Sequence, residues 1–481
     1  MKKTMLLTSL IAVAAMAATT GSVEFGTGTV TDVNTSFKPS TDTKKIEING
    51  TTYTHKLADT FVTTEVKVKE TGFSFGGTFK AKDVVVFTSE TGPNAPKNPD
   101  ILKVFEDTTV WAKYELPEIK GFNSYVKGSW EKIVNAKLEA DVNTMVKGVK
   151  VGVNSNTTLP IYTEENDYGK VVESTHKIYA EAKKLSVLDD VKGNVSLTHT
   201  YNKINSGDKL NKVLGAAIKN VAGEAEVNYN KFENLKLNGK VNFKANVADK
   251  ELKVKKNDVE LVVEDSALYN HEYNVTATYT GVKDLELVAN PFVGHVGVSY
   301  KNENNKVSRN DAAYYGVFAS AKYTGVKNLT LTGKTQLAGV TYVDVREDVV
   351  QPVATDGHFF FDVNAKYDHK VTDKFTVSPE ASAKYAFETE YEALPNAKVK
   401  ALNHSLTLTP KVSAEYKPAD SLTIKGAVEL PVSFGKVKGI NKKDDGTYQP
   451  TTDNDLATKP ENVFGYKSTS FKTSLNVKYT W

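Results

Sequence analysis

The chain has 481 residues, no cysteine and a formal net charge of +3. Without cysteine, disulfides, thiolate metal sites and a cysteine nucleophile are all excluded. The near-neutral charge gives no basic surface of the kind that binds nucleic acid, so nucleic acid is not an expected partner.

The N-terminus has the layout of a secretory signal peptide. Two lysines precede an apolar run from Met5 to Ala18, and Ala15-Met16-Ala17 fits the small-x-small rule for cleavage. We expect a signal peptide over 1–17, cleaved after Ala17 or alternatively after Ala18, and one domain over 18–481. A membrane anchor is the other interpretation, but the apolar run is shorter than the ~20 residues that a spanning helix needs. No later stretch is apolar over such a length, so no transmembrane helix is predicted.

Residues 22–88 alternate less regularly than the rest of the chain. Ser22 to Val30, Thr60 to Lys69 and Phe73 to Phe87 are predicted strands. Asn49-Gly50 is the signal of a tight hairpin, which we place within the first long loop. Residues 91–100 contain three prolines and are therefore predicted to be a loop.

From Val104 the sequence becomes a regular series of strands with a repeated ending. A small or branched residue, any residue and a tyrosine are followed by a short turn into the next strand. These tyrosines are Tyr114, Tyr229, Tyr279, Tyr323, Tyr367 and Tyr416, and Tyr479 repeats the ending at the C-terminus. Longer polar loops fall at about 154–172, 203–211, 248–268, 302–311, 346–357 and 392–400. Short turns at one end and long loops at the other are typical of a transmembrane β-barrel.

The spacing between successive tyrosines also suits a β-propeller blade. A blade packs four short strands into such a repeat, whereas 235–247 and 421–434 alternate over their whole length. Segments of that length suit a tilted membrane crossing. We count 20 strands if every N-terminal segment pairs, and 18 if the first hairpin is a loop or plug. A secreted soluble β-repeat is the alternative.

The long strands have one apolar and one hydrophilic face. In 235–247 the odd positions are apolar or glycine, and the even positions alternate lysine and asparagine. A row of lysines cannot pack in a dry core, because an unpaired buried charge costs several kcal/mol. The wet face is the outside of a soluble sandwich or the lumen of an 18–20-stranded barrel, and we favour the lumen. The predicted pore-lining residues are Lys236, Lys240, Lys244, Lys411, Glu415, Lys425 and Glu429.

The last eleven residues form an alternating strand that runs to the end of the chain. Phe471, Leu475, Val477, Tyr479 and Trp481 share its apolar face. An exposed aromatic edge of this kind must be closed, which a barrel achieves. The tyrosines at the other strand ends then form an interfacial girdle, unless they are ordinary strand residues. This predicted girdle comprises Tyr114, Tyr229, Tyr279, Tyr323, Tyr367 and Tyr416.

A signal peptide, an unbroken series of amphipathic strands and an aromatic terminal strand resemble the Gram-negative outer-membrane β-barrel family, general porins in particular. The resemblance covers essentially the whole chain after the signal peptide. It implies an all-β fold, a transmembrane antiparallel up-and-down β-barrel of about 18–20 strands in the bacterial outer membrane. It also implies a passive diffusion channel for small hydrophilic solutes, surrounded by outer-membrane lipid, and it allows a homotrimer.

In that family the terminal strand is read by the outer-membrane assembly machinery. By resemblance this role falls to Phe471, Leu475, Val477, Tyr479 and Trp481. The chain departs from many porins because Arg309 and Arg346 are its only arginines, so an arginine ladder cannot line its pore. Lysines exceed the carboxylates that we expect on the lumen face, notably Glu415 and Glu429, which predicts a weak anion preference.

No catalytic motif is evident. The eight histidines are scattered without metal-ligand spacing, and no Gly-x-Ser-x-Gly elbow occurs. We therefore expect no enzyme activity, cofactor or metal, and a barrel phospholipase or protease is a weak alternative. No segment has the size of the plug of a TonB-dependent transporter. The main alternative function is an adhesin or structural surface barrel that acts through its external loops.

Overall fold

The computed structural model describes most of the chain from Thr19 onward. Within 19–481 the ranges outside the description are 42–43, 82–83, 89–107, 132–134, 161–169, 186–187, 204–214, 248–251, 257–258, 302–306, 347–348, 351–353, 392–398, 443–446 and 451–461. The predicted signal peptide, its cleavage at Ala17 and the proline-rich loop at 91–100 lie outside the described residues. In the described part, no helix has the length and apolar character of a membrane span.

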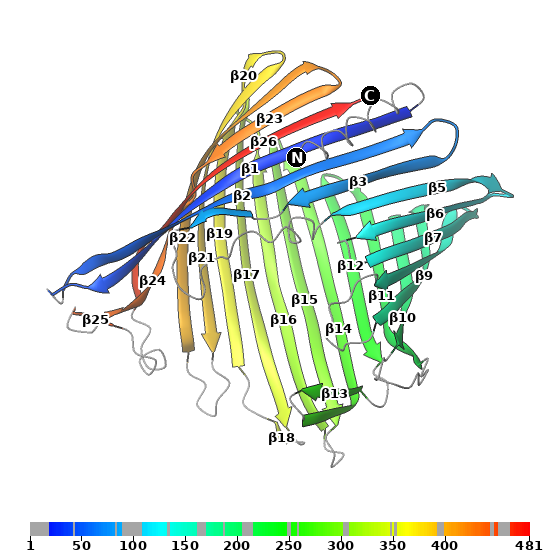
Figure 1. The fold of residues 1–481 in the computed structure, drawn as a ribbon, viewed down its shortest axis with the longest axis horizontal. Helices are drawn as coiled ribbons and strands as arrows, with labels where there is room; N and C mark the ends of the chain where they lie inside the picture. Colours follow the sequence, from blue (N-terminus) through cyan, green and yellow to red (C-terminus); the bar gives the residue numbers. More distant parts are fainter. Residues whose placement is uncertain are drawn as a thin grey trace.

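The chain folds into a closed antiparallel barrel of 20 strands, with three further short strands (Figure 1). The barrel strands are β1 (Thr19–Pro39), β2 (Ile46–Val68), β3 (Phe73–Ala81) continued by β4 (Val84–Thr88), β5 (Thr109–Ile119), β6 (Phe122–Glu131), β7 (Asn135–Val146), β8 (Val149–Pro160), β9 (Lys170–Leu185), β10 (Leu188–Lys203), β11 (Gly215–Phe232), β12 (Leu235–Val247), β14 (Val259–Val282), β15 (Leu285–Lys301), β16 (Val307–Tyr323), β17 (Leu329–Arg346), β19 (Ala354–Tyr367) continued by β20 (His369–Thr372), β21 (Phe375–Tyr391), β22 (Val399–Ala419), β23 (Leu422–Glu429) continued by β24 (Val432–Lys442), and β26 (Asn462–Thr480). The extra strands are β13 (Leu252–Lys256), β18 (Val349–Val350) and β25 (Tyr448–Pro450).

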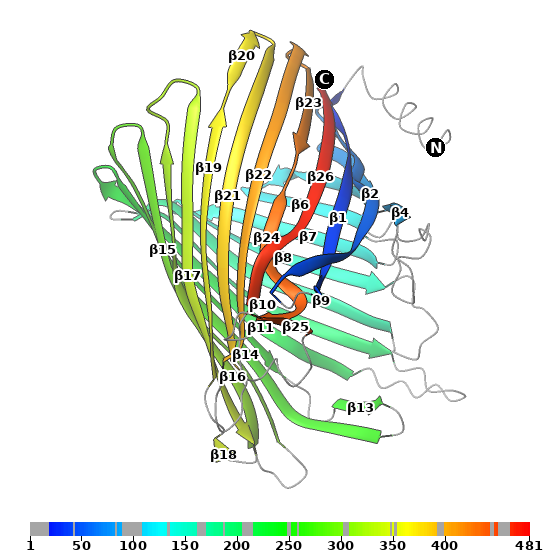
Figure 2. The same cartoon turned by 90° about the vertical axis from the view of Figure 1, so that its left-hand side faces the viewer.

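The first and last strands close the barrel. β26 pairs antiparallel with β1 from Thr480 opposite Ser22 to Ser468 opposite Asn34. Beyond this ladder, Gly21 and Trp481 exchange two backbone hydrogen bonds of 3.1 Å. Figures 1 and 2 show the red β26 running beside the blue β1. Closure pairs the backbone groups that an edge strand would otherwise expose to lipid.

The two ends of the barrel differ in their connections. Short turns join β5 to β6 and β7 to β8, where Lys120-Gly121 and Lys147-Gly148 have positive φ at both residues. That conformation is the type I′ turn, which matches the twist of paired strands. Further residues with φ between 60° and 64°, Glu70, Asn234, Asp284 and Asn328, sit in other short turns. In both views β13 and β18 lie at the opposite end from the C-terminus (Figures 1 and 2).

The N-terminal hairpin corrects one prediction. Asn49-Gly50 does not form a turn, because both residues lie within β2, and the hairpin connection falls at 40–45 instead. The register with β1 shifts where Ser36 faces Gly50 and Phe37 faces Ile48, so Asn49 is the extra residue of a bulge. The two strands pair over nearly their whole length, which gives the larger of the two predicted strand counts.

Several strands extend into segments that were predicted to be loops. β8 runs to Pro160, β14 starts at Val259 and β16 starts at Val307. At these ends the apolar alternation is lost, but backbone pairing continues because both faces of the sheet can be in water there. The predicted strand Phe73 to Phe87 is instead divided into β3 and β4.

The barrel has almost no apolar core. Among the described residues, Val66 and Ala182 are the only buried apolar side chains. Large apolar side chains point outward instead, as with Ile178 and Leu337, which are 67% and 61% exposed. A soluble monomer rarely exposes so many large apolar side chains to water. On the outside of a transmembrane barrel such side chains contact lipid instead. We call the opposite, inward-pointing side of the wall the lumen face.

Candidate pore-lining face

A row of alternating charges crosses five neighbouring strands on the lumen face. On successive strands, directly opposite one another, stand Lys366, Glu380, Lys411, Glu429 and Lys472, in that order. These five residues, the first ladder, come from β19, β21, β22, β23 and β26. Because directly opposed side chains on one sheet face are neighbours, each carboxylate lies between two ammonium groups.

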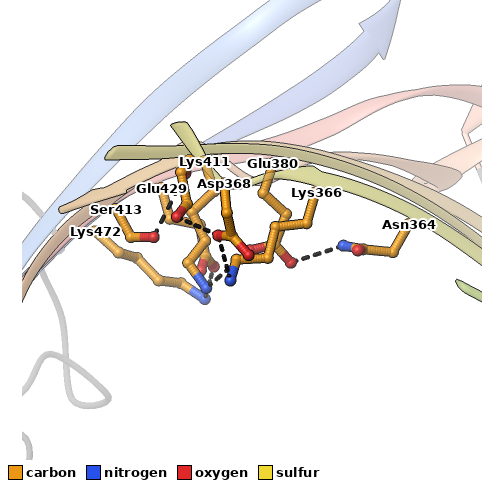
Figure 3. A network of polar contacts seen from close by, with 9 residues as sticks. Asn364, Lys366, Asp368, Glu380, Lys411, Ser413, Glu429 and Lys472 are labelled. Carbon is orange, nitrogen blue, oxygen red and sulfur yellow. Dashed lines mark hydrogen bonds and ion pairs between the residues drawn. The ribbon is translucent and has the colours of Figure 1, made fainter. Parts of the chain in front are cut away.

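The contacts of the first ladder hold its side chains against one another (Figure 3). Lys411 Nζ lies 3.4 Å from Glu380 Oε2, and Lys472 Nζ lies 3.3 Å from Glu429 Oε1. The Asn364 amide donates to Glu380 Oε1 at 2.7 Å. In Figure 3 the labelled side chains gather on the concave side of the wall. The row is therefore hydrogen-bonded into the wall and does not consist of independent charges.

Lys366, which lies near the short-turn end of β19, also has an acidic partner outside the ladder, Asp368. Its Nζ lies 2.8 Å from Asp368 Oδ1, and the Ser378 hydroxyl donates to the same carboxylate at 2.5 Å. The hydrogen bond from Lys366, followed by that from Ser378, lowers the pKa of Asp368. The charge of Lys366 is thus largely compensated at the mouth of the barrel.

A second ladder repeats the pattern on β8 to β12. Lys150, Glu181, Lys192, Glu226 and Lys240 stand opposite one another in that order. Lys192 Nζ lies 3.7 Å from Glu226 Oε2, while Lys240 Nζ turns to Glu224 Oε1 at 3.0 Å. The strands of the two ladders are separated by β14–β17 on one side and by β1–β7 on the other, so the ladders lie on roughly opposite walls of the lumen.

Next to the second ladder and partly on the same strands, β6 to β9 carry a network of neutral donors around two carboxylates. The Tyr125 hydroxyl donates to Glu139 at 2.6 Å, and the Tyr179 hydroxyl donates to Asp141 at 3.0 Å. Asn154 donates to Glu139 at 3.0 Å. Asp141 is only 5% exposed, so its negative charge is held within the wall and contributes less to the open lumen.

The structure brings some of the predicted pore-lining residues together. Glu415 Oε2 lies 2.8 Å from Lys425 Nζ, and Lys411 and Glu429 are opposed in the first ladder. Lys236, Lys240 and Lys244 alternate with the outward-facing positions of β12, of which Val241 and Phe243 are 36% and 44% exposed. In the described part of the chain, Lys236 and Lys244 make no ion pair.

Sequence reasoning missed most of the carboxylates on this face. Glu24, Glu226, Glu272 and Glu380 all bond lumen-facing asparagines or lysines. The signal that could have found them is the same alternation: Glu226 lies three residues before Tyr229, on the face opposite to that tyrosine. The expected excess of lysine over carboxylate is correspondingly smaller than the two named glutamates suggested.

The predicted girdle residues, and Tyr479 and Trp481 of the terminal strand, lie at the short-turn end of the barrel. Tyr114, Tyr279, Tyr323, Tyr367 and Tyr416 are each between 38% and 44% exposed, and Tyr229 packs on Phe232 with ring centroids 5.0 Å apart. In β26, Phe471 and Leu475 are exposed, while the rings of Tyr479 and Trp481 stack at 6.0 Å. The tyrosines and Trp481 have the apolar ring with one polar end that an interfacial belt requires, whereas Phe471 and Leu475 are purely apolar and lie further along β26.

Comparisons with known proteins return structures but no sequence family. No protein-family model and no curated protein matches the chain. OccK7 (OpdD) of Pseudomonas aeruginosa aligns over 97% of this chain and 99% of its own, at 7% identity and a TM-score of 0.37. OpdQ of the same organism aligns over 96% and 98%, at 7% identity and a TM-score of 0.37. The FrpB iron transporter of Neisseria meningitidis aligns over 98% and 82%, at 9% identity and a TM-score of 0.34. The assignment of the fold rests on the strand pairings described above.

Proposed function

We propose that this chain, an outer-membrane β-barrel, is a passive diffusion channel for small hydrophilic solutes. The observation that carries this proposal is a closed 20-stranded wall with apolar side chains outside and charged ladders inside. A barrel of eight strands is filled by its own side chains, whereas one with 16 or more can enclose water. Charged side chains that pair along the wall keep the lumen wet without a desolvated, unpaired charge.

Conductance across a planar bilayer tests the proposal directly. The refolded protein should produce steady, nanosiemens-scale current steps, because a water-filled lumen of this width offers no tight filter. A mock preparation in which the chain is left unfolded in the same detergent serves as the control. A correctly folded, heat-modifiable barrel that inserts without any current would refute a diffusion channel.

The two ladders further support a weak anion preference. Each contains three lysines and two glutamates, and Lys236 and Lys244 add charge near the second ladder. Asp368 and Glu224 lie beside two of the ladder lysines, and opposite charges that are close together cancel beyond about 8 Å at physiological salt. The proposed positive excess is therefore small and rests mainly on Lys236 and Lys244. The preference should therefore be modest and should depend on salt concentration.

Changing Lys236, Lys240 and Lys244 together to Glu should abolish or invert this preference. Reversal potential across a KCl gradient gives the measurement. A matched control changes three lysines outside the lumen wall to Glu, namely Lys147, Lys283 and Lys327 in the short turns, and should leave the reversal potential nearly unchanged. A wild-type preference for cations, or equal shifts in the two variants, would show that the β12 lysines do not line the conduction path.

One observation favours the alternative of an adhesin or surface scaffold. A transmembrane strand needs about 9–11 residues, but β2 has 23 and β14 has 24. The surplus forms hairpin extensions of the barrel wall, which could present a binding surface outside the membrane. If bilayers containing folded protein are silent while whole cells expressing it bind a partner surface, the scaffold function replaces the channel.

A further inference from the structure

Seven of the eight histidines lie on the outward face of the barrel, and six of these lie away from the short-turn end. All eight side chains are described, and these six are His55, His176, His199, His271, His295 and His404. His176 is two residues from Ile178, and His271 is two residues from Tyr273, so each shares the face of a strongly exposed side chain. The remaining two differ: His358 lies on the lumen face 3.2 Å from Glu388, and His369 follows Tyr367 at the short-turn end.

These six histidines, the histidine girdle, stand near the other edge of the apolar band. His271 is eight residues from Tyr279 along β14, and His404 is twelve residues from Tyr416 along β22. At a rise of about 3.3 Å per residue and a tilt of roughly 40°, these spacings correspond to a height of roughly 20–30 Å. The apolar band of an outer-membrane barrel is about 25 Å tall. The tyrosines therefore mark one interface and the histidines the other.

The largest group in the girdle joins β14, β15 and β16. The rings of His271 and His295 lie 5.3 Å apart, and the rings of Tyr269 and His295 lie 5.2 Å apart. Tyr269 donates its hydroxyl proton to Asp311 at 2.7 Å, and His295 Nε2 lies 3.8 Å from the same carboxylate. Asp311 is thus a local counter-charge for His295. Directly opposite His271 stand Phe243 on β12 and His295 on β15. Tyr273, whose ring meets that of His271 at 5.6 Å, is the other titratable neighbour.

The other members have few charged neighbours. His176 and His199 have ring centroids 5.8 Å apart, and Ser155 bonds His176 Nδ1 at 3.0 Å. Of the residues directly opposite these two, Ser155, Ser174, Leu197 and Ile218, none is charged.

His404 and His55 are likewise held by hydroxyl groups. The Tyr385 hydroxyl bonds His404 Nδ1 at 2.7 Å, and Phe387 packs on the same ring at 5.0 Å. Thr31 bonds His55 Nδ1 at 2.8 Å. On β24, Lys436 takes the next register position after Gly435, beside His404, and its side chain lies outside the description.

The chemistry of this belt fits an anionic headgroup. Histidine is the side chain whose charge ordinarily changes between pH 5 and 8, and a protonated imidazole has two N–H donors. Among the described residues no three histidine or acidic side chains gather closely enough to hold a metal ion. We propose that the histidine girdle binds the phosphate groups of the surrounding outer-leaflet lipid, and that it does so more strongly as the pH falls. Because the binding form is the protonated imidazole, the lipid should stabilise the barrel more at pH 5.5 than at pH 7.5.

The test compares full-length barrels refolded into vesicles of phosphatidylcholine alone or with phosphatidylglycerol, whose phosphodiester stays anionic at both pH values. The readout is the midpoint temperature of heat-induced unfolding, which is measured from the change in gel mobility between the folded and the unfolded band. Lowering the pH from 7.5 to 5.5 should raise the midpoint by several degrees in the anionic vesicles relative to the neutral ones. Replacing all six girdle histidines by Gln should remove that difference, while the matched variant with His358→Gln and His369→Gln should keep it.

Two further arms keep the test decisive. If the six-fold variant does not fold, the pairs His271→Gln with His295→Gln and His176→Gln with His199→Gln should each remove part of the difference. Inorganic phosphate added to neutral vesicles should not reproduce it, and an equal effect would assign the site to free phosphate and overturn the lipid proposal. The same pH response in both lipids, or an unchanged response in the histidine variants, would also overturn it.

Discussion

Deleting Trp481 should almost abolish assembly of the barrel. Trp481 N and O bond Gly21 O and N at 3.1 Å, and its indole N–H donates to the Thr19 hydroxyl at 3.3 Å. The indole also covers Gly21, where an added Cβ would lie 2.8 Å from the ring. Removing the residue takes away the hydrogen bonds at the end of the seam between β1 and β26. At this seam the first and last strands of the described chain close the barrel.

The deletion should also weaken recognition by the assembly machinery, a role that we propose for the apolar face of this terminal strand. The folded, heat-modifiable band and surface exposure to protease should both fall to a small fraction of wild type, with the chain left in the periplasm. Replacing Tyr479 and Trp481 together by Ser should have the same effect. The matched control is Lys478→Ser on the lumen face of the same strand, which loses only a pairing of 3.8 Å with Glu24 and should assemble. Normal surface exposure of the deletion variant would contradict the closing role of the strand.

A lysine placed on the outward face of β12 should destabilise the barrel strongly, whereas one placed on the adjacent lumen position should not. Val241 is 36% exposed and stands between Ala225 and Tyr273, in the middle of the apolar band. For Val241→Lys we expect the free energy of unfolding in a bilayer to fall by about 2–4 kcal/mol, the cost of a lysine near the bilayer midplane.

Asn242→Lys is the matched change one residue further along the chain. Asn242 stands between Glu224 and Glu272 on the lumen face, so the new ammonium meets water and two carboxylates. Its effect should lie within about 1 kcal/mol of zero, as for other exposed ion pairs. Urea unfolding of both variants in vesicles measures the difference. Equal costs for the two would mean that the outward and lumen faces of β12 have been assigned the wrong way round.

The alternation of residues by itself determined the strands and their two faces. β12 runs from Leu235 to Val247 as the sequence predicted, and its lysines lie opposite to its apolar side chains. This succeeds because side-chain direction in a strand has a period of two residues and requires no knowledge of the neighbours. Where both faces are in water the period weakens, and for that reason the extensions of β8, β14 and β16 were predicted to be loops.

Strand pairing, in contrast, was decided only by the tertiary structure. The Asn49-Gly50 signal is compatible with a turn or a bulge, and the long pairing of β1 with β2 selected the bulge. The two ladders and the histidine girdle depend on the register of several strands at once. A slip of one residue would place Glu380 opposite an apolar position and break the row, although each strand would keep its own alternation. Register is fixed by closure of the whole barrel, which joins residues more than 400 positions apart, such as Thr29 and Thr473. The pattern of neighbouring residues along the chain therefore contains no information about the register.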